Sequence, residues 1–235
     1  MRIDKLLANM GYGSRTEVKK MLKKGQVSID HDVVKDGKVK VDPDAQQIIV
    51  QGEKVEYRKY VYVMLNKPKG VISATEDPVD KCVTDLLADE YRLFNPFPVG
   101  RLDKDTEGLL LLTNDGQLAH ELLSPKKKVD KIYWAKIDGQ VSEEDVTQFR
   151  HGVQLDDGYM TKPGELIIIK SGPVSEIELQ ITEGKFHQVK RMFKAVGKKV
   201  VELKRLQMGS LKLDPSLSKG DYRELTVEEL NNLKS

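Results

Sequence analysis

The stretch Gly100–Gly108, with the sequence GRLDKDTEG, runs directly into four consecutive leucines, Leu109–Leu112. The turn sequence TNDG follows at Thr113–Gly116. A segment that is apolar at every position predicts a strand buried on both faces. The polar loop before this strand should therefore lie at the edge of the core, where a carboxylate can be held in place and partly removed from water.

Asp103 is the candidate carboxylate in this loop. Its neighbours Arg101 and Lys104 favour the ionised form, which suits a nucleophile or a base. Spacing alone favours a simpler interpretation, in which the Asp and Thr side chains of a turn bind backbone groups. Asp103, Asp105 and Glu107 also fit a glycosidase, whose acid and nucleophile lie about 5–9 Å apart. That hypothesis leaves the clusters of positive charge elsewhere in the chain unexplained.

Patterns beyond the leucines predict an α+β domain with a mixed, mainly antiparallel sheet. Expected strands lie at residues 61–65, 71–72, 109–112, 132–137, 166–169 and 177–181, the last with strict alternation. Expected helices lie around residues 118–123, after the capping box at 142–145, at 189–196 and after a capping box at 226–229.

The N-terminal residues predict a small, separate helical module followed by strands. Helical spacing of apolar residues covers Ile3–Met10, and the capping box Ser14–Glu17 begins a second helix that stops at Gly25. Short strands are expected at 27–29, 39–41 and 48–50, and the polar stretch Glu53–Lys59 is the expected linker. The predicted domains are therefore residues 1–59, a small module, and residues 60–235, a larger domain.

Positive charge is concentrated in two short stretches, although the whole chain carries 39 Lys and Arg against 37 Asp and Glu. Residues 1–24 hold seven basic against two acidic residues, and residues 185–205 hold eight against one. Clustered Lys and Arg predict a polyanionic partner such as RNA. The candidate RNA contacts are Arg2, Arg15, Lys19, Lys20, Lys23 and Lys24 in the first stretch, and Lys185, His187, Gln188, Arg191, Lys194 and Arg205 in the second.

The charged helix face, His187 and the two aromatic residues Tyr133 and Trp134 each allow a structural interpretation beside the functional one. A charged helix face is more often only solvated, and a lone histidine such as His187 is more often packed than catalytic. Tyr133 and Trp134 are neighbours in an expected strand, so they point to opposite faces. One should belong to the core and the other is free to stack on a base, but the pattern leaves open which is which.

Several classes of protein are excluded by composition. No run approaches the roughly 20 apolar residues needed to span a bilayer, and the charged start Met1–Lys5 is unlike a secretory signal. The single cysteine, Cys82, forms no internal disulfide, and neither a Gly-rich phosphate loop nor a metal-ligand spacing is present. We therefore expect a cytoplasmic protein without metal, cofactor or membrane contact, for which a monomer suffices.

Three motifs, in this order and spacing, resemble the RsuA/RluB-type ribosomal RNA pseudouridine synthases. They are LNKPKG at Leu65–Gly70, the stretch Gly100–Gly116 and GKFHQVKRM at Gly184–Met192, and a closing VVEL segment follows at Val200–Leu203. Residues 1–59 resemble an S4 RNA-binding domain. One departure is the DHD sequence at residues 30–32, where many S4 domains carry Asn-Gly.

The resemblance implies an isomerase that converts uridine to pseudouridine in ribosomal RNA, or in a ribosomal assembly intermediate, without a cofactor. Asp103 would be the nucleophile and Lys190 the basic residue that pairs with it. Tyr133 would stack on the flipped uracil, with removal of the C5 proton as a further candidate role, and Arg101 would enter the space that the base vacates. Small-subunit (16S) RNA is the expected substrate. The alternatives are large-subunit (23S) RNA and a ribosome-binding protein without catalysis.

Overall fold

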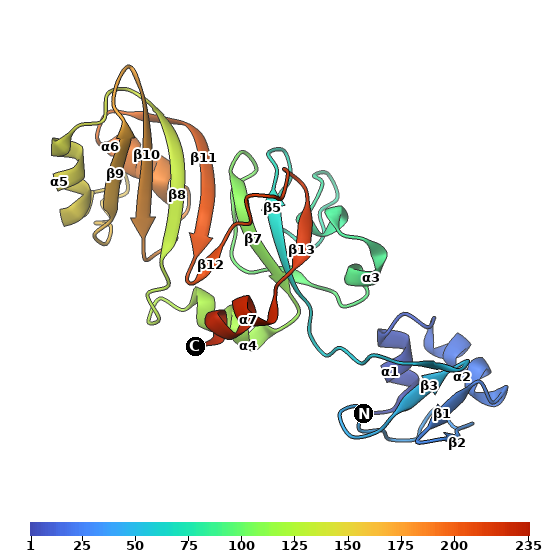
Figure 1. Ribbon diagram of the computed structural model, residues 1–235. Coiled ribbons are helices and arrows are strands. Elements are labelled where there is room, and N and C mark those ends of the chain that lie inside the picture. The colour runs from blue at the N-terminus through green and yellow to red at the C-terminus, as the bar shows by residue number, and fades with distance from the viewer. The chain divides into compact units, whose positions relative to one another are not determined.

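The computed structural model describes residues 1–235 and divides them into two compact units (Figure 1). Unit 1 comprises residues 1–61 and 88–95, and unit 2 comprises residues 62–87 and 96–235. None of the helices combines the length and the apolar character that crossing a bilayer requires.

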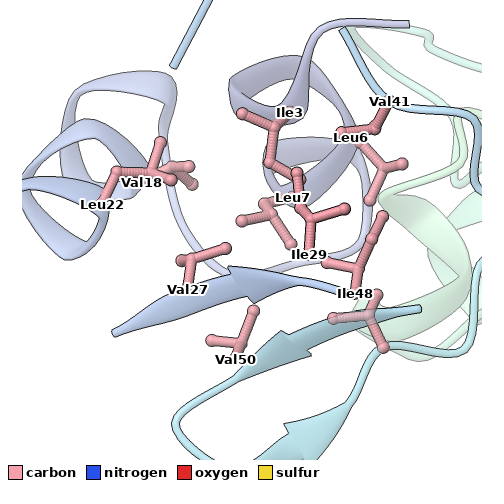
Figure 2. Packing of buried hydrophobic residues seen from close by; sticks show 11 residues of the cluster. Ile3, Leu6, Leu7, Val18, Leu22, Val27, Ile29, Val41, Ile48 and Val50 are labelled. Carbon is pink, nitrogen blue, oxygen red and sulfur yellow. The ribbon is translucent and has the colours of Figure 1, made fainter. Parts of the chain in front are cut away.

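Unit 1 packs two helices on a small antiparallel sheet. The helices α1(Ile3–Asn9) and α2(Arg15–Lys23) confirm the predicted pair, and Ser14 and Glu17 form the expected capping box. The sheet has the order β2-β1-β3-β4, with the bounds β1(Val27–Ile29), β2(Asp32–Val33), β3(Ile48–Val50) and β4(Glu53–Lys54). Apolar side chains of both helices and of β1 and β3 form the core between the two layers (Figure 2). The short helix α3(Asp89–Arg92) belongs to the same unit.

Two predictions for unit 1 are wrong in detail. Residues 39–41 form no regular strand, because Val39 O accepts from Ile3 N and Val41 N donates to Met1 O, so their backbone groups pair with the N-terminal residues. Glu53 and Lys54 are part of β4, paired with β3, and not of a linker. Local alternation does not reveal such partners.

Unit 2 is built on a nine-stranded sheet in the order β13-β5-β7-β11-β8-β10-β9, with β6 paired to β7 and β12 to β11. Only β7 and β11 pair in parallel, which confirms the predicted mixed, mainly antiparallel sheet. The strands are β5(Tyr62–Lys67), β6(Phe97–Pro98), β7(Glu107–Thr113), β8(Lys131–Asp138), β9(Glu165–Lys170), β10(Val174–Ile181), β11(Lys199–Met208), β12(Leu211–Lys212) and β13(Tyr222–Glu224). The helices are η1(Val83–Leu86), α4(Gly116–Leu123), α5(Glu143–His151), α6(Gln188–Ala195) and α7(Val227–Lys234).

The leucine strand is buried as its composition predicts. Every residue of β7 is buried, and Leu109–Leu112 have no exposed surface. The strand expected at Val71–Ile72 is absent, because Ile72 forms only a single bridge, to Cys82. Two β-branched residues in sequence are too short a signal to define a strand.

The parallel pairing of β7 and β11 aligns Glu107 with Lys204 and Gly108 with Arg205. At this junction Gly108 has a φ of +103°, and a Cβ atom on it would lie 2.3 Å from the Arg205 carbonyl oxygen. Glycine is therefore required for the two backbones to approach this closely. Because the strands are parallel, the segments that precede them, the Asp103 loop and helix α6, lie at the same end of the sheet.

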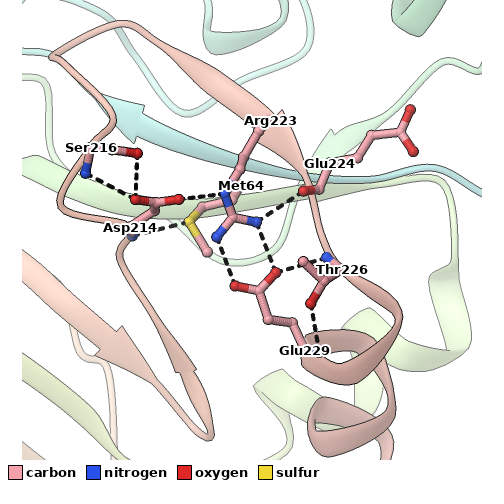
Figure 3. A network of polar contacts seen from close by, with 7 residues as sticks. All are labelled: Met64, Asp214, Ser216, Arg223, Glu224, Thr226 and Glu229. Carbon is pink, nitrogen blue, oxygen red and sulfur yellow. Dashed lines mark hydrogen bonds and ion pairs between the residues drawn. The ribbon is translucent and has the colours of Figure 1, made fainter.

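A polar network in unit 2 joins the segment at Asp214, strand β13 and helix α7 (Figure 3). Arg223 donates from Nε to Asp214, at 2.6 Å, and from both Nη atoms to Glu229, each at 2.8 Å. Hydrogen bonds from Ser216 and Arg223 lower the pKa of Asp214 to about 2. Since Arg223 lies in β13 and Glu229 in α7, this network joins the edge strand to the last helix.

Candidate active site

The loop that carries Asp103 is held by backbone contacts to two buried or half-buried side chains. The Lys67 ammonium, without exposed surface, donates to the carbonyls of Pro68, Asp103 and Thr106 at 3.1, 3.0 and 2.9 Å. The Ser73 hydroxyl accepts from the Leu102 N–H and donates to the Leu102 carbonyl. These contacts fix the backbone on both sides of the Asp103 side chain.

Sequence reasoning missed the roles of Lys67 and Ser73. Lys67 enters the prediction only as part of the LNKPKG motif, although a lysine that follows the apolar run Val61–Leu65 by two positions is itself a signal that a buried partner is needed. Burial lowers the pKa of Lys67 to about 8, and the carboxylates of Asp103, Asp105 and Glu107 oppose that shift.

The Asp103 carboxylate is about one-quarter exposed and meets two cationic or polar side chains from the 187–190 segment. Lys190 Nζ lies 2.9 Å from Asp103 Oδ2 and 2.6 Å from Asp105 Oδ1. His187 Nε2 lies 3.5 Å from Asp103 Oδ1. Partial burial opposes protonation of Lys190, but the hydrogen bonds to Asp105 and Asp103 outweigh it and raise the pKa of Lys190. The site therefore holds an ion pair whose partners are 87 positions apart in the chain.

Asp103 opens onto a cleft of about 790 Å³ that is lined by the loop at 100–104 and the segment 184–187, together with residues 72–74. Arg101 is exposed and lines this cleft. An adjoining recess of about 70 Å³ is lined by Arg101, Asp103 and Tyr133. The structure thus brings the loop with Arg101 and Asp103 together with Tyr133 and the segment around Lys190, three parts of the chain that are far apart in the sequence.

The choice between Tyr133 and Trp134 is resolved by strand β8. Tyr133 points inward with only 8% of its surface exposed, yet it reaches the recess beside Asp103. Trp134 lies on the opposite face, half-buried, with Lys136 Nζ 5.6 Å from its ring centre. Tyr133 is therefore a core residue that also lines the recess beside Asp103, a combination that the sequence pattern does not distinguish.

Two candidate RNA contacts of the second basic stretch are corrected by the structure. Arg205 is 2% exposed and donates from Nε to the Leu109 carbonyl at 2.8 Å. Gln188 is 4% exposed, donates to Glu183 and accepts from the Lys185 N–H. Both side chains are used inside the fold, because inward-facing positions of a strand and of a helix carry them, so neither is available to RNA.

The other members of that stretch differ in how free they are. Arg191 is held by Asp156 and Asp157, at 2.8 Å from Nε and 2.7 Å from Nη2, and these hydrogen bonds raise its pKa. Lys185 and Lys194 are exposed. A surface depression of about 610 Å³ lies among Asp156, Asp157, His187, Lys190, Arg191 and Lys194, with Phe186 at its border.

The first basic stretch lines a groove in unit 1. Arg2, Lys19, Lys20 and Lys23 border this groove of about 340 Å³. Arg2 is also paired with Asp4, at 2.6 Å. Sequence reasoning missed Lys35 and Lys38, which lie in the loop after β2 and also line the groove. It included Arg15 and Lys24, which are exposed but do not line the groove.

Two protein-family models match different parts of this chain. The family model described as RNA pseudouridylate synthase matches residues 61–195, and that of the S4 domain matches residues 1–46. The uncharacterized RNA pseudouridine synthase YtzG of Bacillus subtilis (strain 168) is 58% identical over 99% of this chain and 98% of that protein.

Two further relatives are named for different ribosomal subunits. Ribosomal small subunit pseudouridine synthase A of Yersinia pestis is 40% identical over 98% of this chain and 97% of that protein. Ribosomal large subunit pseudouridine synthase B of Bacillus subtilis (strain 168) is 41% identical over 100% of this chain and 96% of that protein. A crystal structure of a pseudouridylate synthase aligns over 99% of both chains, with 34% identity and a TM-score of 0.70.

Proposed function

Because this chain belongs to the RNA pseudouridylate synthase family and carries an S4 domain, we propose that it isomerises a uridine of ribosomal RNA to pseudouridine with Asp103 as the nucleophile. The observation that carries the proposal is the position of the Asp103 carboxylate, 2.9 Å from the Lys190 ammonium and open to a cleft. The proposed substrate is ribosomal RNA or a ribosomal assembly intermediate, and the proposed location of the reaction is the cytoplasm.

The chemistry is an intramolecular exchange of one bond. Asp103 attacks the target nucleoside, at the base or the sugar, and helps to break the bond between the ribose and N1 of uracil. The uracil then rotates and rejoins the ribose through C5, and the bond that Asp103 formed breaks and frees the carboxylate. The C5 proton is lost while N1 gains one. Atoms balance without a cofactor, oxidant or reductant. A carboxylate beside a cation suits this role because it is charged and partly desolvated.

The neighbouring side chains have separate roles in the proposal. Tyr133 receives the flipped uracil against its ring and is the candidate acceptor of the C5 proton, since it lines the recess beside Asp103. Lys190 positions the carboxylate through their ion pair. Arg101, exposed at the cleft, enters the space that the base leaves, which offsets the few kcal/mol that unstacking costs.

The proposed substrate is small-subunit (16S) RNA, with residues 1–59 as the RNA-binding domain and residues 60–235 as the catalytic domain. A second binding domain raises the effective concentration of the first at its target. Large-subunit RNA is the second candidate, and the 41% identity to the Bacillus subtilis large-subunit enzyme favours it as much as the 40% identity to the Yersinia pestis small-subunit enzyme favours the first. Mapping pseudouridine in both RNAs of cells with and without this protein separates the two.

The Asp103→Asn variant tests the nucleophile. We expect product formation to fall by at least roughly 10³-fold, because the amide cannot attack, while RNA binding is retained. Asp105→Asn is the matched control, since Asp105 shares Lys190 but has a side chain that is 70% exposed. It should lose less than about tenfold. Product is measured as pseudouridine in single-turnover reactions.

Two results would contradict this assignment. Normal turnover by Asp103→Asn would remove Asp103 from the reaction. If the wild-type protein binds RNA but forms no pseudouridine in it, the result would favour a ribosome-binding protein without catalysis.

A further inference from the structure

Phe186 exposes an aromatic ring at the border of the cleft that contains Asp103. The residue is 72% exposed, and it borders both this cleft and the depression among Lys190, Arg191 and Lys194. A single exposed apolar residue is ordinary on a protein surface. Its position between the Asp103 carboxylate and a depression lined by three cations and by Asp156 and Asp157, with which Arg191 and Lys194 are paired, is what requires an explanation.

The ring is held in a defined orientation. Phe186 and His187 stack with ring centres 3.8 Å apart and planes 20° apart. One face of the Phe186 ring is therefore covered by His187, and the exposure of the residue places the other face toward solvent. A flat apolar surface that is ordered before binding loses little conformational entropy when a planar group covers it.

The backbone beneath the ring is constrained as well. His187 has a φ of +49°, in the left-handed region that non-glycine residues seldom adopt. The segment is tied down by Gln188, which accepts from the Lys185 N–H at 2.8 Å and donates to Glu183 at 2.7 Å. Such a conformation persists only where the surroundings enforce it, and it is common at functional sites.

The ring lies one side chain away from the reacting carboxylate. His187 Nε2, on the edge of the imidazole ring, is 3.5 Å from Asp103 Oδ1, and a face of the same ring stacks on Phe186. Exposed Lys185 and Lys194 flank the ring in sequence and across the depression, where they can neutralise phosphates. An aromatic face between cations is the arrangement with which proteins bind single-stranded nucleic acid.

We propose that the open face of Phe186 is a stacking site for the base of a nucleotide adjacent to the target uridine in the RNA substrate. The inference rests on the proposed function, since it takes the target uridine to lie at Asp103. Stacking accepts any base, so this site selects an unpaired neighbour without selecting its identity. It therefore restricts the substrate to uridines whose neighbour can leave its own stack.

The test uses the full-length Asp103→Asn protein, which should bind RNA without converting it, and a short single-stranded RNA around a uridine that the wild-type protein converts. The nucleotide on one or the other side of that uridine is replaced by 2-aminopurine, whose fluorescence falls when it stacks on an aromatic ring. We compare Phe186→Leu, which keeps an apolar side chain without a ring, with Phe186→Tyr, which keeps the ring. Ile167→Leu is the matched control, because Ile167 is 53% exposed on β9 and does not line the cleft.

We expect quenching at one of the two neighbouring positions with Phe186 and with Phe186→Tyr, and its loss with Phe186→Leu. The Kd should rise roughly 5- to 150-fold for Phe186→Leu, the range expected for one stacked base, and should not change for Ile167→Leu. Equal quenching and equal Kd for Phe186 and Phe186→Leu, in an RNA that the wild-type protein converts, would overturn this inference alone. If the wild-type protein converts no uridine in either ribosomal RNA, the proposed function fails and this inference fails with it.

Discussion

Lys67 illustrates how a single buried amine can shape the loop that carries Asp103. An ammonium has three N–H donors, and Lys67 uses them on three carbonyls, two of which belong to that loop. Because burial lowers its pKa only to about 8, the amine is mainly protonated at pH 7. Lys67 therefore positions the backbone of Asp103, the proposed nucleophile, from a site that has no exposed surface.

The lowered pKa of Lys67 predicts a pH dependence of stability. Between about pH 8 and pH 10 the folded protein has largely lost this proton, whereas the unfolded chain, with an ordinary lysine pKa, keeps most of it. The contribution of Lys67 to the free energy of unfolding therefore rises with pH in this window. We expect the free energy of unfolding of the wild type, minus that of Lys67→Met, to increase by about 2 kcal/mol from pH 8 to pH 10.

Urea unfolding of the two proteins at several pH values measures this difference. Lys67→Met should also be less stable at pH 7, since three carbonyls lose their donor. A difference between the two proteins that stays constant across the window would mean that the pKa of Lys67 is not lowered.

At the scale of elements, the parallel contact between β7 and β11 assembles the site. β7 continues from the Asp103 loop, and β11 follows helix α6, which carries Lys190. Strand β8 pairs with β11 so that Tyr133 lies opposite Arg205, beside the same junction. Three elements that are distant in the chain thereby place Tyr133 at the recess that Asp103 lines, and Lys190 at 2.9 Å from the Asp103 carboxylate.

The glycine at this junction offers a test of its tightness. Gly108→Ala would place Cβ 2.3 Å from the Arg205 carbonyl oxygen at a φ of +103°, so the strands must separate. We expect a loss of stability of about 3 kcal/mol or more, from strain and overpacking together. Gly158→Ala is the control, because Gly158 also has a positive φ, +83°, but nothing lies within 4 Å of its Cβ position.

The control should lose only about 1–2 kcal/mol, the cost of the backbone conformation. Thermal and urea unfolding measure both variants. If Gly108→Ala and Gly158→Ala lose the same stability, the close approach of β7 and β11 is not what requires glycine at position 108.

In the whole molecule, two separate basic surfaces are the candidate contacts for the proposed RNA substrate. One is the groove of unit 1 with Lys19, Lys20 and Lys23, and the other surrounds the cleft of unit 2. Contacts to phosphate release counterions, so each contributes to the salt dependence of binding and not to sequence preference.

The variant Lys20→Gln/Lys23→Gln tests the groove. If each lysine neutralises one phosphate, the slope of log K against log salt should become shallower by roughly 1.4–1.8 in total. Lys54→Gln, which removes an exposed charge of the same unit outside the groove, should leave the slope unchanged. Binding of a ribosomal RNA fragment at several salt concentrations measures the slope, and an unchanged slope in the double variant would exclude the groove from RNA binding.

Much of the fold follows from local pattern. The capping boxes at Ser14 and Thr226 predict helices that form as expected, and the four leucines predict a strand that is fully buried. The family resemblance, carried by three short motifs, is confirmed by the family models and by the relatives. Arg205 and Gln188 were misplaced, since a charge count does not reveal which polar side chains turn inward.

Amino-acid pattern alone is enough to locate most of the longer helices and strands, the buried leucine strand and the loop with its carboxylate, because periodicity and capping are local properties of a chain. The meeting of Asp103 with Lys190, the burial of Lys67 against three carbonyls and the inward turn of Tyr133 are decided by tertiary structure. The first depends on the parallel register of β7 and β11, whose paired residues are about a hundred positions apart in the chain. The second depends on the pairing of β5 with β7, and the third on the pairing of β8 with β11.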